Sequence, residues 1–266
     1  MSIEDKGLSI HILIAAYDSP GSDVAGRSAD KFKAFVRTQN PQSTTALIGS
    51  KLTRKAFKSK YAAALTNLAE PNTRVVVCMV GHGSQFADHD GDESDGWDEG
   101  FLTANGVLKD DELTDMLNRV AVHSTSLLIL VSDHCSSGTM LDKQRSRPGK
   151  NWVNIASSQP KEDSFEVREG TAMLCSLLKY LRAFPGVTVG QLLRGFPAHM
   201  RDDMKQMADP VLQWIPDEQH PCISLSSDSV RSMPLLHHPS TQQALCNQRA
   251  SRHHLISSSS KRGPAG

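Results

Sequence analysis

The sequence has no excess of charge of either sign and few cysteines, and both shortages exclude classes of protein. Lysine plus arginine and aspartate plus glutamate each number 29, so no overall electrostatic field favours binding to a nucleic acid or to an anionic membrane. The five cysteines are an odd number and include no C-x-x-C pair, which argues against a disulfide framework and against a cysteine-rich metal site. These features predict a protein of the reducing cytoplasm.

Long apolar runs are also missing. The first 19 residues contain one short apolar segment, which is preceded by acidic residues and is too brief to cross a bilayer. The sequence therefore predicts neither a membrane anchor nor a secretion signal. Its 266 residues are enough for one large α/β domain or for two small ones.

The apolar runs that do occur are short, and two of them end in residues that can carry chemistry. Residues 127–131 are all aliphatic, as in a strand buried on both faces, and a small polar stretch with Cys135 follows them. Residues 75–80 form a similar run, which ends at His82 between two glycines. Open α/β sheets place their chemistry at the carboxyl ends of parallel strands, so we expect the two side chains to meet there. Cys135 alone would be equally well explained as an ordinary buried thiol.

The rest of the chain is read as further strands, helices and one acidic loop. Strands are expected at residues 8–17, 44–49, 152–158 and 220–225, and helices at residues 22–37, 54–68, 110–120, 169–182 and 189–204. Residues 84–100 are expected to form a loop that is too acidic to pack. Its alternating acids do not make an EF-hand, because the sixth position from Asp88 is Glu93 where a glycine is required.

Four motifs together make the sequence resemble the metacaspases. They are GHGSQ at residues 81–85, DHDGDESDGWDE at residues 88–99, KDDEL at residues 109–113 and DHCSSGT at residues 133–139. The likeness extends over about residues 10–227, and His82 precedes Cys135 by 53 residues, near the caspase spacing of about 50. The family implies a caspase-like three-layer α/β/α sandwich around a mostly parallel central sheet. It also implies a cysteine endopeptidase, here a short form because almost nothing precedes the first strand.

Cys135 and His82 are the catalytic dyad that this resemblance implies. The thiolate of Cys135 would attack the scissile carbonyl, and His82 would accept the thiol proton and later protonate the leaving amine. The backbone N–H groups of Gly83 and Cys135 are the candidates for holding the oxyanion. The family places Asp30 and Asp133 in a doubly anionic substrate-binding pocket, which implies cleavage after Arg or Lys.

Four positions depart from the family pattern. Arg27 stands where the family has a pocket cysteine and Val80 where it has a small hydroxyl residue. His134 and Ser136, which flank the nucleophile, replace a small residue or cysteine and a histidine. These departures leave open a catalytically weak or inactive homologue that acts as a calcium- or partner-binding module. A legumain-like peptidase is a further alternative, because its E-A-C-x-S-G motif is similar to residues 133–138, but the missing signal segment counts against it.

The resemblance also implies an activating calcium ion, Ca2+. In calcium-dependent members four acids bind the ion, and they fall here on Asp98, Asp110, Asp111 and Asp142. Such a set suits calcium, which takes about six to eight oxygen ligands. Asp110 and Asp111 have a complete alternative explanation, since acids favour the amino-terminal end of a helix.

The expected organisation is a single caspase-like domain over residues 1–230. It would consist of a larger part (1–142), a basic junction (143–150) and a smaller part (151–230), with a disordered tail at residues 231–266. The junction offers Lys143, Arg145 and Lys150 as self-cleavage sites of a zymogen, whereas Arg147 is disfavoured because a proline follows it. The expected partners are peptides or proteins with basic residues, and the protein is expected to act as a monomer.

Overall fold

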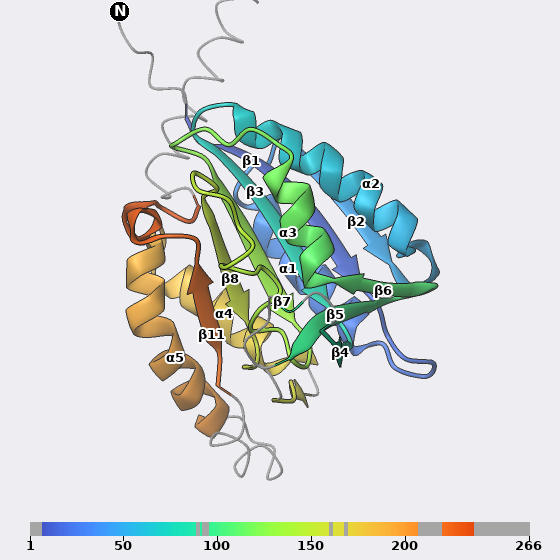
Figure 1. Cartoon of the computed structure of the whole chain (residues 1–266). Coiled ribbons are helices and arrows are strands. Elements are labelled where there is room, and N and C mark those ends of the chain that lie inside the picture. The colour runs from blue at the N-terminus through green and yellow to red at the C-terminus, as the bar shows by residue number, and fades with distance from the viewer. Residues whose placement is uncertain are drawn as a thin grey trace, which may run out of the picture.

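A central sheet of six strands organises the structure, a computed structural model that describes residues 7–88, 91, 96–159, 162–167, 170–206 and 220–236 (Figure 1). The spatial order of the strands is β11-β8-β7-β3-β1-β2. Their bounds are Ser9–Ala16 (β1), Ser43–Ile48 (β2), Thr73–Val80 (β3), Leu127–Asp133 (β7), Trp152–Ala156 (β8) and Cys222–Leu225 (β11). All neighbours run parallel except β11, which is antiparallel to β8.

Helices cover both faces of this sheet, as the three-layer prediction requires. On one face lie α1 (Val24–Arg37), α4 (Ala172–Ala183) and α5 (Val189–Gln206), and on the other lie α2 (Arg54–Leu65) and α3 (Asp110–Asn118). Figure 1 shows α2 and α3 in front of the sheet. Successive residues of the buried strands alternate between the two cores, so Val76 packs with the first group of helices and Val77 with the second. The predicted fold class is confirmed.

The three strands at the middle of the sheet end level with one another. Ala16 of β1 pairs with Val80 of β3, and Val80 pairs in turn with Asp133 of β7. β3 and β7 are buried along their whole length, which explains their uninterrupted apolar sequences. The residues that follow these three strands are therefore delivered to one edge of the sheet.

The acidic segment after β3 is packed in part, so the prediction of an acidic loop over residues 84–100 was wrong at both ends. A small antiparallel sheet forms there from β4 (Gly83–Ala87), β5 (Trp97–Thr103) and β6 (Gly106–Lys109). Asp98 and Glu99 on β5 are 3% and 1% exposed. Each acid is buried because it has a partner: Asp98 pairs with Lys109, and Glu99 accepts hydrogen bonds from Gln85 and Thr139.

The chain beyond residue 230 also packs on the fold, which corrects the expected start of the tail. Val230 and Leu235 are buried, and the N–H of Leu235 donates to the carbonyl of Val187 at 3.1 Å. The buried Arg74 side chain donates to the carbonyl of Pro234 at 2.9 Å. Apolar contacts and these hydrogen bonds to the backbone hold residues 231–236 on the fold. Composition alone did not reveal this packing. Residues 237–266 lie outside the described residues.

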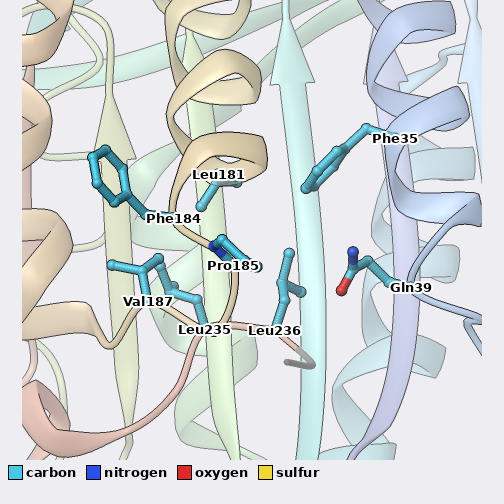
Figure 2. A pocket seen from close by; sticks show the side chains of 9 residues that line it. Phe35, Gln39, Leu181, Phe184, Pro185, Val187, Leu235 and Leu236 are labelled. Atoms are coloured by element: carbon cyan, nitrogen blue, oxygen red, sulfur yellow. The ribbon is translucent and has the colours of Figure 1, made fainter. Parts of the chain in front are cut away.

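A small apolar pocket lies between the ends of α1 and α4 and this last segment. Phe35, Leu181, Phe184, Leu235 and Leu236 are among the side chains that line it (Figure 2). α1 starts at the carboxyl edge of the sheet and Phe35 is near its far end, so the pocket lies at the edge opposite to Cys135. Among the described helices, none combines the length and apolar composition that crossing a bilayer requires.

The predicted basic junction forms turns without a helix or strand, and it is tied down along its length. The carboxylate of Asp142 accepts from the N–H groups of Gln144 and Arg145 at 2.6 and 2.8 Å. The side chain of Asn118 on α3 accepts from the N–H of Arg147 at 2.9 Å, and the Lys150 ammonium donates to a carbonyl just after α3. The junction is therefore a surface segment that is anchored on α3 by these contacts.

Candidate active site

The predicted catalytic residues follow the adjacent strands β3 and β7. The N–H of Gly81 donates to the carbonyl of Asp133 at 3.2 Å, which continues the pairing of the two strands past their ends. A side chain at Gly83 would overlap the carbonyl oxygen of Cys135, so the two loops are in close contact. His82 lies between these two contacts. The structure therefore brings His82 beside the nucleophile loop, as the sequence predicted, and also places Gly83 there.

Cys135 is covered by a segment that follows β8. Its sulfur accepts a hydrogen bond from the N–H of Ser164 at 3.4 Å. Burial, followed by the neighbouring carboxylate of Asp163, raises the pKa of the Cys135 thiol. The next residue, Ser136, has a φ of +52° and donates its N–H to the carbonyl of Glu162 at 2.9 Å. In this state the Cys135 side chain is partly covered, and its thiolate form is disfavoured relative to the thiol.

His82 is hydrogen-bonded to the loop that follows β1. Its Nε2 lies 2.9 Å from Oγ of Ser19, in the loop that follows β1. This contact leaves Nδ1 as the ring nitrogen available to another partner. The sequence gave no sign of Ser19, because a serine in an exposed loop has no pattern that distinguishes it.

His134, one of the departures from the family pattern, is a fully buried and neutral side chain. Burial lowers its pKa to about 4. Nδ1 lies 3.0 Å from the carbonyl oxygen of Cys135, and a carbonyl only accepts, so Nδ1 carries the proton and donates. The ring packs on Phe101 of β5 with centroids 5.1 Å apart, and within the described part of the chain its Nε2 has no hydrogen-bond partner. His134 therefore holds the backbone of Cys135 through this hydrogen bond.

Asp133, a predicted pocket acid, is completely buried and accepts hydrogen bonds from its own chain. The N–H of Leu174 donates to it at 3.0 Å, the Ser164 hydroxyl at 3.1 Å, and the Thr171 hydroxyl also donates. Burial raises its pKa to about 6, against the opposing effect of these hydrogen bonds. In this state the carboxylate is closed off from solvent.

The second predicted pocket acid, Asp30, lies on α1 with its side chain exposed, whereas Asp133 is buried. The inward-facing residue of this helix is Ser28, which accepts from the N–H of Thr171 at 2.9 Å. Two helical residues differ in direction by about 200°, which turns Asp30 away from the residues around Asp133. The shared pocket role of Asp30 and Asp133 stays a prediction.

The four predicted calcium ligands divide into two pairs, each with its own basic partner. Asp98 is paired with Lys109, but its buried Oδ1 has no hydrogen-bond partner among the described residues. Asp110 is also buried, and burial raises its pKa to about 8, helped by the nearby carboxylates of Glu99 and Asp111. Its oxygens accept from the N–H groups of Asp111 and Glu99. Asp98 and Asp110 thus lie close to further carboxylates, Glu99 and Asp111, and Lys109 is the basic side chain paired with Asp98.

The other two predicted ligands, Asp111 and Asp142, both hold Arg145. The Arg145 guanidinium lies 3.0 Å from Asp111 and 3.1 Å from Asp115, while Asp142 accepts from its N–H. Within the described part of the chain, no three histidine, cysteine or acidic side chains are gathered closely enough to hold a metal ion.

The three self-cleavage candidates differ in their accessibility. Lys143 is exposed, whereas Arg145 is partly buried in its ion pairs and Lys150 is partly buried at α3. The sequence did not distinguish them in this way, because the carboxylates that hold Arg145 come from a helix some thirty residues earlier in the chain.

The comparisons with known proteins identify one family. A model of the metacaspase, peptidase C14 domain matches residues 28–144. Metacaspase-1 of Cryptococcus neoformans is 33% identical over 128 residues, which are 44% of this chain and 26% of that protein. Metacaspase-1 of Plasmodium falciparum is 29% identical over 170 residues, 53% of this chain and 28% of that protein. The chain thus spans about a quarter of the length of these curated relatives.

Two further similarities agree with this result. Metacaspase-3 of Arabidopsis thaliana is 44% identical over 72 residues, which are 26% of this chain and 20% of that protein. A crystal structure of a protein from Geobacter sulfurreducens superposes with a TM-score of 0.62 over 87% of this chain and 98% of its own, and its 19% sequence identity supports the fold alone. Over residues 28–144 this chain is therefore similar to the metacaspase, peptidase C14 domain.

Proposed function

We propose that this protein is a cysteine endopeptidase in which Cys135 is the nucleophile and His82 the proton carrier. The observation that carries the proposal is the level pairing of β3 and β7, which delivers the two residues to the same edge of the sheet. The family supports it, because the matched segment contains both residues. The pseudo-peptidase alternative keeps the same fold and differs only in whether Cys135 reacts.

The reaction would begin with transfer of the thiol proton from Cys135 to His82, followed by attack of the sulfur on the scissile carbonyl. A thioester forms, the C–N bond breaks, and His82 returns the proton to the departing amine; water then hydrolyses the thioester. The N–H groups of Gly83 and Cys135 lie in the two contacting loops and are the proposed oxyanion donors. Burial, followed by the carboxylate of Asp163, raises the pKa of the Cys135 thiol, so uncovering the sulfur and withdrawing Asp163 would favour the thiolate.

We propose that substrates carry Arg or Lys before the cleaved bond, with Asp133 as the binding anion. A buried carboxylate whose present donors are hydroxyl and N–H groups can exchange them for an ammonium or guanidinium group. Ser164 is the donor to be displaced, because it belongs to the segment that also covers Cys135. Asp30 on the outer face of α1 contributes at most a weak long-range attraction.

Calcium activation is proposed on the chemistry of the donor set. Carboxylate oxygens suit a hard cation, and one buried oxygen of Asp98 has no hydrogen-bond partner among the described residues. Burial raises the pKa of Asp110, so its carboxylate form is disfavoured in this state and a bound cation would favour it. Asp98, Asp110, Asp111 and Asp142 would hold the ion once Lys109 and Arg145 release the acids that they occupy. A bound calcium ion would neutralise these acids.

Self-processing is proposed at Lys143, because it is the exposed candidate of the three. Lys143 lies eight residues after Cys135. This short tether would keep its local concentration near the active site of the same molecule high. A reducing compartment such as the cytoplasm is proposed as well, since the nucleophile works only as a thiol; four described cysteines, including Cys135, form no disulfide.

A panel of fluorogenic peptides with Arg, Lys, Asn or Asp before the cleaved bond tests this function. The wild type should cleave the Arg and Lys peptides, and Cys135→Ala and His82→Ala should not. Cys175→Ala removes another partly buried thiol and serves as the matched control, which should keep wild-type turnover. A preference for Asn would favour the legumain-like alternative, and no turnover with or without calcium would favour the inactive module.

A further inference from the structure

Ser19 lies beside the catalytic residues through the level ends of three adjacent strands. β1, β3 and β7 are neighbours in the sheet, and Ala16, Val80 and Asp133 lie in register across them. Ser19 follows the end of β1, His82 follows β3 and Cys135 follows β7. The histidine is therefore in the middle of a row, with Ser19 on one side and Cys135 on the other.

The loop that presents Ser19 is anchored on both sides, although Ser19 itself is exposed. The N–H of Tyr17 donates to the carbonyl of Val80 at 3.0 Å, and Asp18 caps α1 by accepting from the N–H of Ala25 at 2.7 Å. The carbonyl of Ser19 accepts from the N–H of Ser22 at 3.0 Å in a turn. Ser19 is thus held in place by backbone contacts.

The histidine side of the contact is equally constrained. Gly81 has a φ of +148°, and a side chain there would overlap the carbonyl oxygen of Tyr17. Only glycine allows the β1 and β3 loops to approach so closely. This approach sets the 2.9 Å distance between Oγ of Ser19 and Nε2 of His82.

The contact has a chemical consequence for the ring of His82. A neutral imidazole carries one proton, and it can accept the thiol proton through Nδ1 only if Nε2 already bears the other. A hydroxyl that accepts from Nε2–H favours that tautomer, and it accepts the same bond when the ring becomes an imidazolium. Among the described residues no carboxylate is hydrogen-bonded to His82, and the Ser19 hydroxyl is the hydrogen-bond partner of its ring.

We propose that Ser19 is a positioning residue for His82, holding Nε2 as a donor so that Nδ1 faces Cys135. The inference rests on the proposed function, since it concerns the proton carrier of that reaction. His134 on the β7 loop interacts electrostatically with His82, and the other titratable groups on the segments that meet here are Cys135 on the β7 loop, Asp163 on the segment after β8, and Asp18 and Tyr17 on the β1 loop.

A matched control exists within the chain. Ser43 and His11 form another exposed serine–histidine pair with the same distance of 2.9 Å, at the amino end of β1 and far from Cys135. Ser19→Ala should lower kcat on an Arg peptide about tenfold and leave KM nearly unchanged, because one hydrogen bond to the proton carrier is lost. Ser19→Thr retains the hydroxyl and should restore most of the rate, and Ser43→Ala should behave as wild type.

Nitrogen NMR of the imidazole rings, with His82→Ala to assign the signal, gives a readout that does not require turnover. Wild type should show His82 as the Nε2–H tautomer, and Ser19→Ala should show exchange between the two tautomers. An unchanged His82 signal together with an unchanged kcat in Ser19→Ala would overturn the inference. If the wild type cleaves no peptide, the proposed function fails, and the tautomer signal alone supports or overturns the role of Ser19.

Discussion

Replacing Asp133 by asparagine removes a carboxyl group that the fold buries completely and holds with neutral donors. Its pKa is about 6 in the folded protein, above the ordinary value of 3.8, because burial disfavours the charged form. A raised folded pKa means that the stability contribution is fully present below about pH 4 and is lost as the pH rises through about pH 6. The difference between the two pKa values lowers the free energy of unfolding by about 3 kcal/mol above about pH 6, compared with its value below about pH 4.

The asparagine side chain can keep the same contacts. Its carbonyl oxygen can accept from the N–H of Leu174 and the hydroxyl of Thr171, and its amide can donate to the hydroxyl of Ser164, which rotates freely. Asp133→Asn therefore changes the pH dependence without opening a cavity. Its stability relative to wild type should increase by about 3 kcal/mol between about pH 4 and about pH 7.

Urea unfolding followed by tryptophan fluorescence at a series of pH values measures this difference. Asp30→Asn is the matched control, because that acid is exposed and its replacement should leave the pH profile parallel to wild type. If the difference between Asp133→Asn and wild type stays constant from about pH 4 to about pH 7, burial does not perturb this carboxyl group and the argument is refuted.

Three further predictions concern activation of the site. Asp163→Asn should lower the pKa of the Cys135 thiol and speed its alkylation by iodoacetamide near neutral pH; equal rates at all pH values would contradict this. Asp111→Ala should abolish stimulation of peptide cleavage by calcium, and equal wild-type activity in calcium and in a chelator would remove the calcium proposal. Lys143→Ala should suppress calcium-induced fragments in mass spectra more than Arg145→Ala does, and an intact wild-type chain that still cleaves peptides would exclude self-processing.

The sheet and the approach of the His82 loop to the Cys135 loop were predictable because the sequence encodes them locally. The aliphatic run that became β7 has no polar residue before Ser132, and such a run can only be a strand buried on both faces. Gly81 and Gly83 mark the turn where His82 is presented. These signals need no knowledge of what packs against them.

The environment of the dyad was not predictable, because it depends on segments far apart in sequence. Asp133 is held by donors from residues 164–174, and no local pattern distinguishes Ser164 from other serines. The burial of Asp98 and Glu99 depends on Lys109 and Thr139, so the acidic composition alone pointed to a solvated loop. The outward direction of Asp30 likewise depends on which face of α1 meets the sheet.

Covalent labelling with an arginyl probe that reacts with a catalytic thiol tests the central claim most directly. The labelled protein is digested, and mass spectrometry locates the modified residue among the five cysteines. The account predicts labelling of Cys135 in wild type, slow or no labelling in His82→Ala, and none in Cys135→Ala. Labelling of another cysteine, or near-wild-type peptide turnover in Cys135→Ala, would contradict the assignment of Cys135 as the nucleophile.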